Sequence, residues 1–232
     1  PFFLAHPFNL PLAEFDAALG PPQQWIVEWK WDGIRAQLVK RGGQAWLWSR
    51  GEELVTERFP ELAQMGQALP DGTVLDGEIV VWRHDRVQPF AELQKRIGRK
   101  AVSARLMKDL PVVLLAYDIL EWEGQDMRSR PQAQRRELLD DVVTQLQHPA
   151  LIASPMLAGD GWAELARQRE QARELGVEGL MLKQRDAAYG VGRTKESGVW
   201  WKWKIDPMSV DAVLIYAQRG HGRRASLYSD YT

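Results

Sequence analysis

The sequence predicts an α+β fold in which antiparallel sheets are flanked by helices. Segments of alternating polarity, many of them rich in Trp, Ile and Val, predict strands. Apolar residues at helical spacing predict helices between these strands, and short turns such as Arg41-Gly42-Gly43 join neighbouring strands into hairpins. The predicted strands span 25–39, 44–48, 73–82, 112–120, 180–183, 199–205, 210–217 and 225–229, and the predicted helices span 56–69, 90–97, 131–146 and 160–176.

The ends of several elements are also indicated by residue type. Thr56 and Asp160 are predicted N-caps, because their side-chain oxygens can accept from free backbone N–H groups. Pro131 is well tolerated in a first helical turn, and Gly176 is typical of the residue after a helix. We place a domain boundary at Asp206-Pro207, which predicts one domain over residues 1–206 and the beginning of another over 207–232.

Composition excludes several classes of protein. The 232 residues include no cysteine, so disulfides and cysteine-ligated zinc are excluded. No apolar run approaches the roughly 20 residues of a membrane span, and no basic leader precedes the first apolar residues. The net charge of −1 argues against nucleic-acid binding by the whole surface and leaves room for a local basic patch. We expect a cytoplasmic protein, and the missing initiator Met indicates a piece of a multidomain parent.

Charged residues occupy alternate positions around Lys30. Side chains on a strand alternate between faces, so Glu28, Lys30 and Asp32 are expected on one face. Such a row is either a solvated face with pairs of opposite charge, or the setting of a nucleophilic lysine. The amine of a nucleophilic lysine must lose its proton, and its usual pKa of about 10.4 falls only through desolvation or a nearby cation. A neighbouring Asp has the opposite effect, so the second interpretation requires a metal site.

The segment Lys30-Trp31-Asp32-Gly33-Ile34-Arg35 resembles the Lys-x-Asp-Gly-x-Arg signature of covalent nucleotidyltransferases, the superfamily of DNA ligases and mRNA capping enzymes. Five further segments resemble the family's other elements and follow in the family's order. They are Ser49–Glu52, Leu75–Val80, Tyr117-Asp118, Glu178–Lys183 and Trp200–Lys204. The likeness is greatest to the adenylation domain of bacterial ATP-dependent DNA ligases, and it implies an ATP-grasp-like nucleotidyltransferase fold.

The resemblance implies a role for each matching residue. Lys30 would attack the α-phosphate of ATP to form a lysyl-AMP adduct, with Asp32 as the second catalytic residue of the signature. Nucleotide contacts are implied for Glu28, Lys30, Arg35, Arg50, Glu78, Tyr117, Lys183, Lys202 and Lys204. Lys202 and Lys204 share a strand face, where two adjacent cations favour an anion such as a triphosphate between them.

The implied cofactors are ATP, or covalently bound AMP, and Mg²⁺. Glu78 and Glu178 are the implied metal ligands, because carboxylate oxygens suit Mg²⁺. Strict alternation would place Glu178 and Lys183 on opposite faces, whereas both face the nucleotide in the family. We therefore expect Glu178 in the turn before its strand.

Nicked double-stranded DNA is the implied partner. The adenylate would pass to the DNA 5′-phosphate, and the 3′-hydroxyl would then seal the nick. Two basic segments are the predicted DNA contacts, with Lys95, Arg96, Arg99 and Lys100 in the first and Arg219, Arg223 and Arg224 in the second. Phosphate contacts from such segments give salt-dependent, sequence-independent binding. Runs of this kind also occur as solvated helix ends and turns, and the sequence leaves both interpretations open.

The segment from Val210 onward resembles the opening of the OB-fold domain that follows in DNA ligases. On this interpretation the parent protein also carries an N-terminal DNA-binding domain and the remainder of the OB domain. The family's last motif, which orients the pyrophosphate leaving group, is absent from the 232 residues. We therefore expect slow self-adenylation by this chain alone.

Other functions remain open at this stage. An mRNA capping guanylyltransferase and an RNA ligase share the Lys-x-Asp-Gly signature. A non-catalytic nucleic-acid-binding module is the alternative from another class, because eleven Trp can stack on bases. Trp29, Trp31, Trp201 and Trp203 fall on the faces opposite the charged rows, so they are expected in the core, which favours the enzyme.

Overall fold

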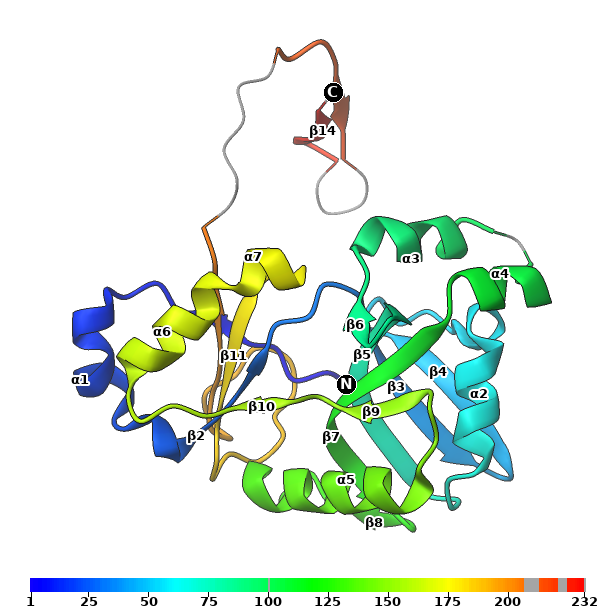
Figure 1. Ribbon diagram of the computed structural model, residues 1–232, viewed down its shortest axis with the longest axis horizontal. Helices are drawn as coiled ribbons and strands as arrows, with labels where there is room; N and C mark the ends of the chain where they lie inside the picture. The colour runs from blue at the N-terminus through cyan, green and yellow to red at the C-terminus, as the bar shows by residue number, and fades with distance from the viewer. Residues whose placement is uncertain (100, 207–212, 221–224, 232) are drawn as a thin grey trace.

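The computed structural model has two main sheets that lie side by side with a short chain crossing between them (Figure 1), and a third sheet of two strands near the C-terminus. It describes residues 1–99, 101–206, 213–220 and 225–231. Both sheets are mainly antiparallel and carry helices on their outer faces, so the predicted α+β class is confirmed. No helix within these ranges is long and apolar enough to cross a membrane.

The larger sheet has seven strands in the order β4-β3-β5-β7-β8, with β6 paired to β5 and β9 paired to β7. Its strands are β3 (Ile34–Arg41), β4 (Gln44–Ser49), β5 (Thr73–Arg83), β6 (Arg86–Val87), β7 (Val112–Trp122), β8 (Gln125–Asp126) and β9 (Leu151–Ala153). All pairs are antiparallel except β7 with β9. β4 is therefore an edge strand.

Four helices accompany the larger sheet, namely α2 (Pro60–Gln67), α3 (Phe90–Ile97), α4 (Ala104–Asp109) and α5 (Gln132–Leu146). Leu62 of α2, Leu93 of α3 and Leu139 of α5 are buried in one apolar core with Leu38 and Leu114 of the sheet. Burial of such side chains stabilises the fold by about 1.5–3 kcal/mol each, so the helices are held mainly by this shared core.

The smaller sheet has the strand order β1-β12-β11-β2-β10. Its strands are β1 (His6–Pro7), β2 (Trp25–Trp29), β10 (Met156–Leu157), β11 (Gly179–Gln184) and β12 (Trp200–Lys204), and its helices are α1 (Phe15–Leu19), α6 (Trp162–Glu170) and α7 (Ala172–Leu175). Phe15, Trp162 and Trp203 pack together beneath it. Trp31 and Trp203 are buried, and Trp29 and Trp201 pack against apolar cores, as expected.

The predicted strand 25–39 is wrong in one respect, because it is two strands in different sheets. β2 ends at Trp29 and β3 begins at Ile34, and residues 30–33 cross between the sheets. A Cβ atom at Gly33 would lie 2.3 Å from the carbonyl oxygen of Ile79, so only glycine allows the crossing segment to approach β5. Strand alternation therefore does not set the directions of Lys30 and Asp32.

Most other predicted strands are confirmed, but two predicted caps are wrong. The hydroxyl of Thr56 accepts from the backbone of Leu47, and helix α2 begins only at Pro60. Gly161, rather than Asp160, occupies the N-cap of α6, and no side chain caps that helix. Gly176 follows α7 in the left-handed conformation, as expected.

The C-terminal hairpin is confirmed only in part. β13 (Ala217–Arg219) pairs with β14 (Tyr228–Tyr231), whereas residues 213–216 form no strand. Residues 207–212 and 221–224, on which the rest of the predicted hairpin falls, lie outside the described residues. The beginning of an OB fold is not confirmed.

A buried ion pair joins α5 to β7. Arg135 and Asp118 are both fully buried, and two bonds of 2.8 and 2.9 Å link the guanidinium to the carboxylate. Gln132 donates to the same carboxylate and accepts from the indole of Trp200 in the other sheet. Asp118 is thus a structural residue, and this network ties the two halves of the fold together.

We expect Arg135→Met to lower the free energy of unfolding by about 3–5 kcal/mol, because it leaves the Asp118 carboxylate buried and unpaired. Arg128→Met is the control, since Arg128 pairs with Asp126 in a largely exposed position and should lose less than about 1 kcal/mol. Urea unfolding followed by circular dichroism measures both. Equal losses would contradict the structural role.

Candidate active site

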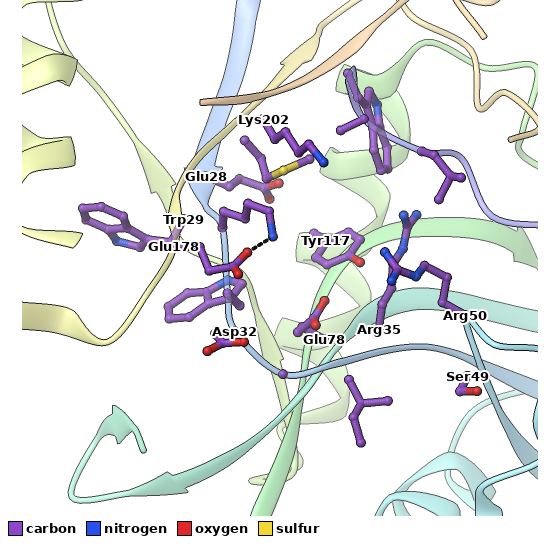
Figure 2. A pocket seen from close by; sticks show the side chains of 18 of the residues that line it. Glu28, Trp29, Asp32, Arg35, Ser49, Arg50, Glu78, Tyr117, Glu178 and Lys202 are labelled. Carbon is purple, nitrogen blue, oxygen red and sulfur yellow. Dashed lines mark hydrogen bonds and ion pairs between the residues drawn. The ribbon is translucent and has the colours of Figure 1, made fainter. Parts of the chain in front are cut away.

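A cleft of about 850 Å³ opens at the crossing between the two sheets (Figure 2). It is lined from both sheets and from the segment after β4. Ten of the residues predicted from the sequence line it, namely Glu28, Lys30, Asp32, Arg35, Arg50, Glu78, Tyr117, Glu178, Lys183 and Lys202. Lys204 is not among the lining residues. The fold therefore brings side chains from distant segments into one cavity.

Lys30 is held in place by its backbone. Its N–H donates to the carbonyl of Gly179 and its carbonyl accepts from Glu178, each at 2.8 Å. These bonds extend the pairing of β2 with β11 by one residue, so the lysine stays in register after the strand ends. Glu178 lies directly before β11, where the sequence analysis placed it.

The side chains of Lys30 and Glu178 form an ion pair in the cleft (Figure 2). Lys204 approaches the same carboxylate from β12 at 3.4 Å. Burial raises the pKa of Glu178, but the hydrogen bonds from Lys30 and Lys204 and their positive charges lower it more. The pKa of Glu178 therefore lies below its usual value. Glu178 is therefore a carboxylate at neutral pH.

Asp32 and Lys202 are also perturbed by the site. Burial and the negative charge of Glu178 raise the pKa of Asp32. Burial and the positive charges of Lys30, Arg193 and Lys204 lower the pKa of Lys202. Crowding of cations around Lys202 is the setting in which a bound anion is favoured.

Glu78 lies opposite Arg35 in the β3–β5 pairing, yet the ion pair of Arg35 is with Asp76. Its guanidinium donates to Asp76 at 2.7 and 3.2 Å and to the carbonyl of Phe3. Burial raises the pKa of Glu78 to about 8, although the charges of Arg35 and Lys30 oppose this. Glu78 is therefore largely protonated at neutral pH until a cation reaches it.

The inner end of the cleft carries an aromatic wall with a buried lysine. The ammonium of Lys183 lies 4.0 Å from the ring centre of Tyr117 and 4.5 Å from that of Trp200. It also pairs with Glu28 at 2.5 Å. Burial lowers the pKa of Lys183, although the Glu28 carboxylate acts in the opposite direction.

Sequence reasoning missed Arg136, which completes this buried group. Arg136 on α5 pairs with Glu28 and with Asp140 and donates to the carbonyl of Ser154. In the sequence, Arg136 and Asp140 have the spacing of an ordinary exposed helix pair. Only its ion pair with Glu28 of β2, which is distant in the sequence, shows that the arginine is buried.

Glu78 and Glu178, the two predicted metal ligands, both line the cleft. Among the described residues, no group of three or more His, Asp or Glu side chains could hold a metal ion by itself. Mg²⁺ is usually held by one or two carboxylates together with phosphate and water oxygens, so two acids suffice.

The predicted DNA contacts differ in their accessibility. Lys95 and Arg99 are exposed, and Lys95 pairs with Glu92. Arg96 is fully buried, pairs with Glu61 and donates to the carbonyl of Arg58, so the prediction that it binds DNA is wrong. Arg96 points inward because Glu61, from a distant segment, pairs with it there, whereas Lys95 and Arg99 face solvent. Arg219 is exposed on β13, and Lys100, Arg223 and Arg224 lie outside the described residues.

The chain matches the family model described as the ATP dependent DNA ligase domain over residues 3–204. It is 35% identical to a probable DNA ligase of Koribacter versatilis, with 100% of this chain and 43% of that protein covered. It is 34% identical to a DNA ligase of Natronomonas pharaonis, with 98% and 41% covered. The chain therefore belongs to the ATP-dependent DNA ligase family, and it spans less than half the length of these relatives.

Solved structures agree with this assignment. A mycobacterial DNA ligase D complexed with ATP and MES is 31% identical, with a TM-score of 0.66 over 88% of this chain and 59% of that chain. The ligase domain of LigD from M. tuberculosis is 30% identical, with a TM-score of 0.67 over 88% of this chain and 60% of that one. Chlorella virus DNA ligase-adenylate, at 19% identity and a TM-score of 0.62 over 88% of this chain and 68% of that one, shares the fold.

The perturbed pKa of Glu78 predicts a pH-dependent stability. Between its ordinary pKa of 4.5 and about 8, the folded protein retains a proton that the unfolded chain has released. Stability is therefore lost as the pH rises through this window. Glu78→Gln removes this ionisation. The free energy of unfolding of the variant, relative to that of the wild type, should therefore rise by roughly 1–3 kcal/mol between about pH 5 and about pH 9.

Urea unfolding of the nucleotide-free protein in EDTA measures this difference. Glu137→Gln, at an exposed position on α5, is the matched control. A gap between Glu78→Gln and wild type that stays constant across the pH range would show that Glu78 titrates normally.

Proposed function

We propose that this chain is the adenylation domain of an ATP-dependent DNA ligase and that Lys30 is its nucleophile. The amine of Lys30 attacks the α-phosphate of ATP, forming a nitrogen–phosphorus bond as the bond to pyrophosphate breaks. The AMP then passes to the 5′-phosphate of nicked DNA, and the 3′-hydroxyl displaces it to seal the nick. Family membership supports this reaction. The contact of Lys30 with Glu178 inside a cleft lined by further acids and bases is the observation that carries it.

The amine must be unprotonated when it attacks. The ion pair with Glu178 occupies the Lys30 amine, so this contact has to be exchanged before the reaction. Asp32 is the proposed proton acceptor, because its raised pKa brings it closer to that of the lysine. Mg²⁺ held by Glu78 and Glu178 would neutralise phosphate charge and favour the neutral amine.

The nucleotide is oriented by residues on either side of Lys30. Tyr117 offers its ring to the adenine base at the inner end of the cleft, next to the buried pair of Glu28 and Lys183. Lys202 is placed to bind the phosphates and Arg50 to contact the ribose or the DNA 5′-phosphate. Positioning and charge neutralisation are the main requirements of phosphoryl transfer, and these side chains supply both.

The domain assignment extends this proposal to the whole chain. Residues 1–206 would form the adenylation domain, and residues 207–232 would begin an OB-fold domain. The antiparallel pairing of β13 with β14 supports the second part. Nicked duplex DNA would lie across the face that carries the exposed Lys95 and Arg99.

Incubation with ATP and Mg²⁺ should add one AMP to Lys30, located by peptide mass mapping, with slow accumulation. Lys30→Ala should form no adduct, and Lys30→Arg should form none either because a guanidinium stays protonated. Lys108→Ala, at an exposed position on α4, should behave as wild type. An adduct on another lysine, or a preference for GTP over ATP, would contradict the proposal.

Arg99→Ala should weaken binding to nicked duplex DNA. The slope of log K against log salt concentration should fall by about 1, the amount expected for one lost phosphate contact. Arg96→Ala should instead lower stability, because it leaves Glu61 without its buried partner. Arg105→Ala is the control, since Arg105 is exposed on α4. Fluorescence anisotropy at several salt concentrations measures the binding, and equal effects of Arg99→Ala and Arg105→Ala would argue against a specific contact.

A further inference from the structure

A second cleft, of about 620 Å³, is lined by residues of the edge strand β4 and of the C-terminal end of α3 and the segment after it. Trp46 and Leu54 line it on one side, and Ile97 and Arg99 line it on the other. Its volume is within the range of roughly 300–1,000 Å³ that is usual for small-molecule sites. Neither the nucleotide contacts nor the metal site proposed above uses this cleft.

Trp46 presents an indole ring to this cleft. Along β4, Ala45 and Leu47 are buried, whereas Trp46 and Trp48 point away from the core and are 37% and 43% exposed. No aromatic ring or cation of the described residues packs on the Trp46 ring. An accessible indole face beside a cavity is a stacking surface for a flat, polarisable group.

The cleft is also basic. Arg58 and Arg99 line it, and neither side chain forms an ion pair with a described residue. Arg96, within α3, differs from these two arginines because it is buried and paired with Glu61. Glu57 is the one acid among the described lining residues. Two arginines with free guanidinium groups favour a phosphate.

This cleft adjoins the cleft around Lys30. Arg58 and Ile97 line both cavities. A polymer that places one of its phosphates near Lys30 can therefore extend into the second cleft without leaving the protein surface. A free mononucleotide would gain nothing from two adjoining clefts, whereas a nucleic-acid strand would.

We propose that the second cleft binds an unpaired nucleotide of a DNA strand beside the nick, with its base stacked on Trp46 and its phosphate between Arg58 and Arg99. The inference rests on the proposed DNA ligase function and adds a subsite for single-stranded DNA to it. A base in a duplex cannot stack on Trp46, because both of its faces are covered by neighbouring base pairs. The subsite therefore prefers ends that are frayed or carry a flap.

Fluorescence anisotropy at low salt should measure the affinity for three nicked duplexes that differ only at the nick. One is fully paired, one carries a short unpaired thymidine flap on the 5′ side, and one carries the same flap on the 3′ side. The wild-type chain should bind one of the flapped duplexes more tightly than the paired duplex. The two flaps distinguish which strand end supplies the nucleotide.

Trp46→Ala should weaken binding of the preferred flapped duplex roughly tenfold, the usual loss when a stacked base loses its aromatic partner. Trp46→Phe should remain within about threefold of wild type, because phenylalanine still stacks. Trp48→Ala is the matched control, since Trp48 is equally exposed on the same face of β4 and does not line the cleft. It should bind all three duplexes as wild type does.

Equal affinity of the wild type for paired and flapped duplexes would overturn the inference, as would an equal loss on both in Trp46→Ala. Unchanged binding of the flapped duplex by Trp46→Ala would overturn it as well. Formation of the Lys30 adduct with ATP in the same preparations shows separately whether the proposed function stands. Trp46→Ala should leave that adduct unchanged, because Trp46 does not line the cleft around Lys30.

Discussion

The active-site geometry depends on the backbone pairing of Lys30 with the residues that precede β11. The two backbone hydrogen bonds with Glu178 and Gly179 fix Lys30 at the point where the chain leaves the smaller sheet. Gly33 then allows the chain to pass close to β5 and enter the larger sheet. Because the crossing joins the sheets, a side chain there faces groups from both. The Lys30 side chain consequently meets Glu178 from one sheet and faces the cavity that Glu78 lines from the other.

Charge is distributed unevenly around this crossing, and the distribution suits the chemistry. Structural ion pairs such as Asp118 with Arg135 are fully buried and satisfied, so they keep the sheets together without taking part in binding. In the cleft, by contrast, Lys202 lies among other cations, and burial raises the pKa of Glu78 to about 8. Phosphate would stabilise the positive charge of Lys202, and a divalent cation would stabilise the negative charge of Glu78. The charges of the cleft therefore suit the ligands proposed for it.

Much of this site could be predicted from the sequence, because its chemistry is carried by short segments in a fixed order. The resemblance of these segments to the family indicates Lys30, Glu78 and Glu178. Because both Glu178 and Lys183 face the nucleotide in the family, against strict alternation, it also places Glu178 before its strand. The burial of Arg96 and Arg136 could not be predicted, since it is set by Glu61 and Glu28 from distant segments. The break in the strand near Gly33 was missed for the same reason, because its cause is the nearby carbonyl of Ile79.

The central claim is that the Lys30 amine and the α-phosphate of ATP meet in the cleft between the sheets. A crystal structure of the protein after incubation with ATP and Mg²⁺ tests it most directly. The account predicts continuous electron density from Nζ of Lys30 to a phosphorus atom, with Glu178 released from the lysine and the adenine against Tyr117. Nucleotide bound elsewhere, or in this cleft with its α-phosphate away from an unmodified Lys30 that still pairs with Glu178, would contradict it.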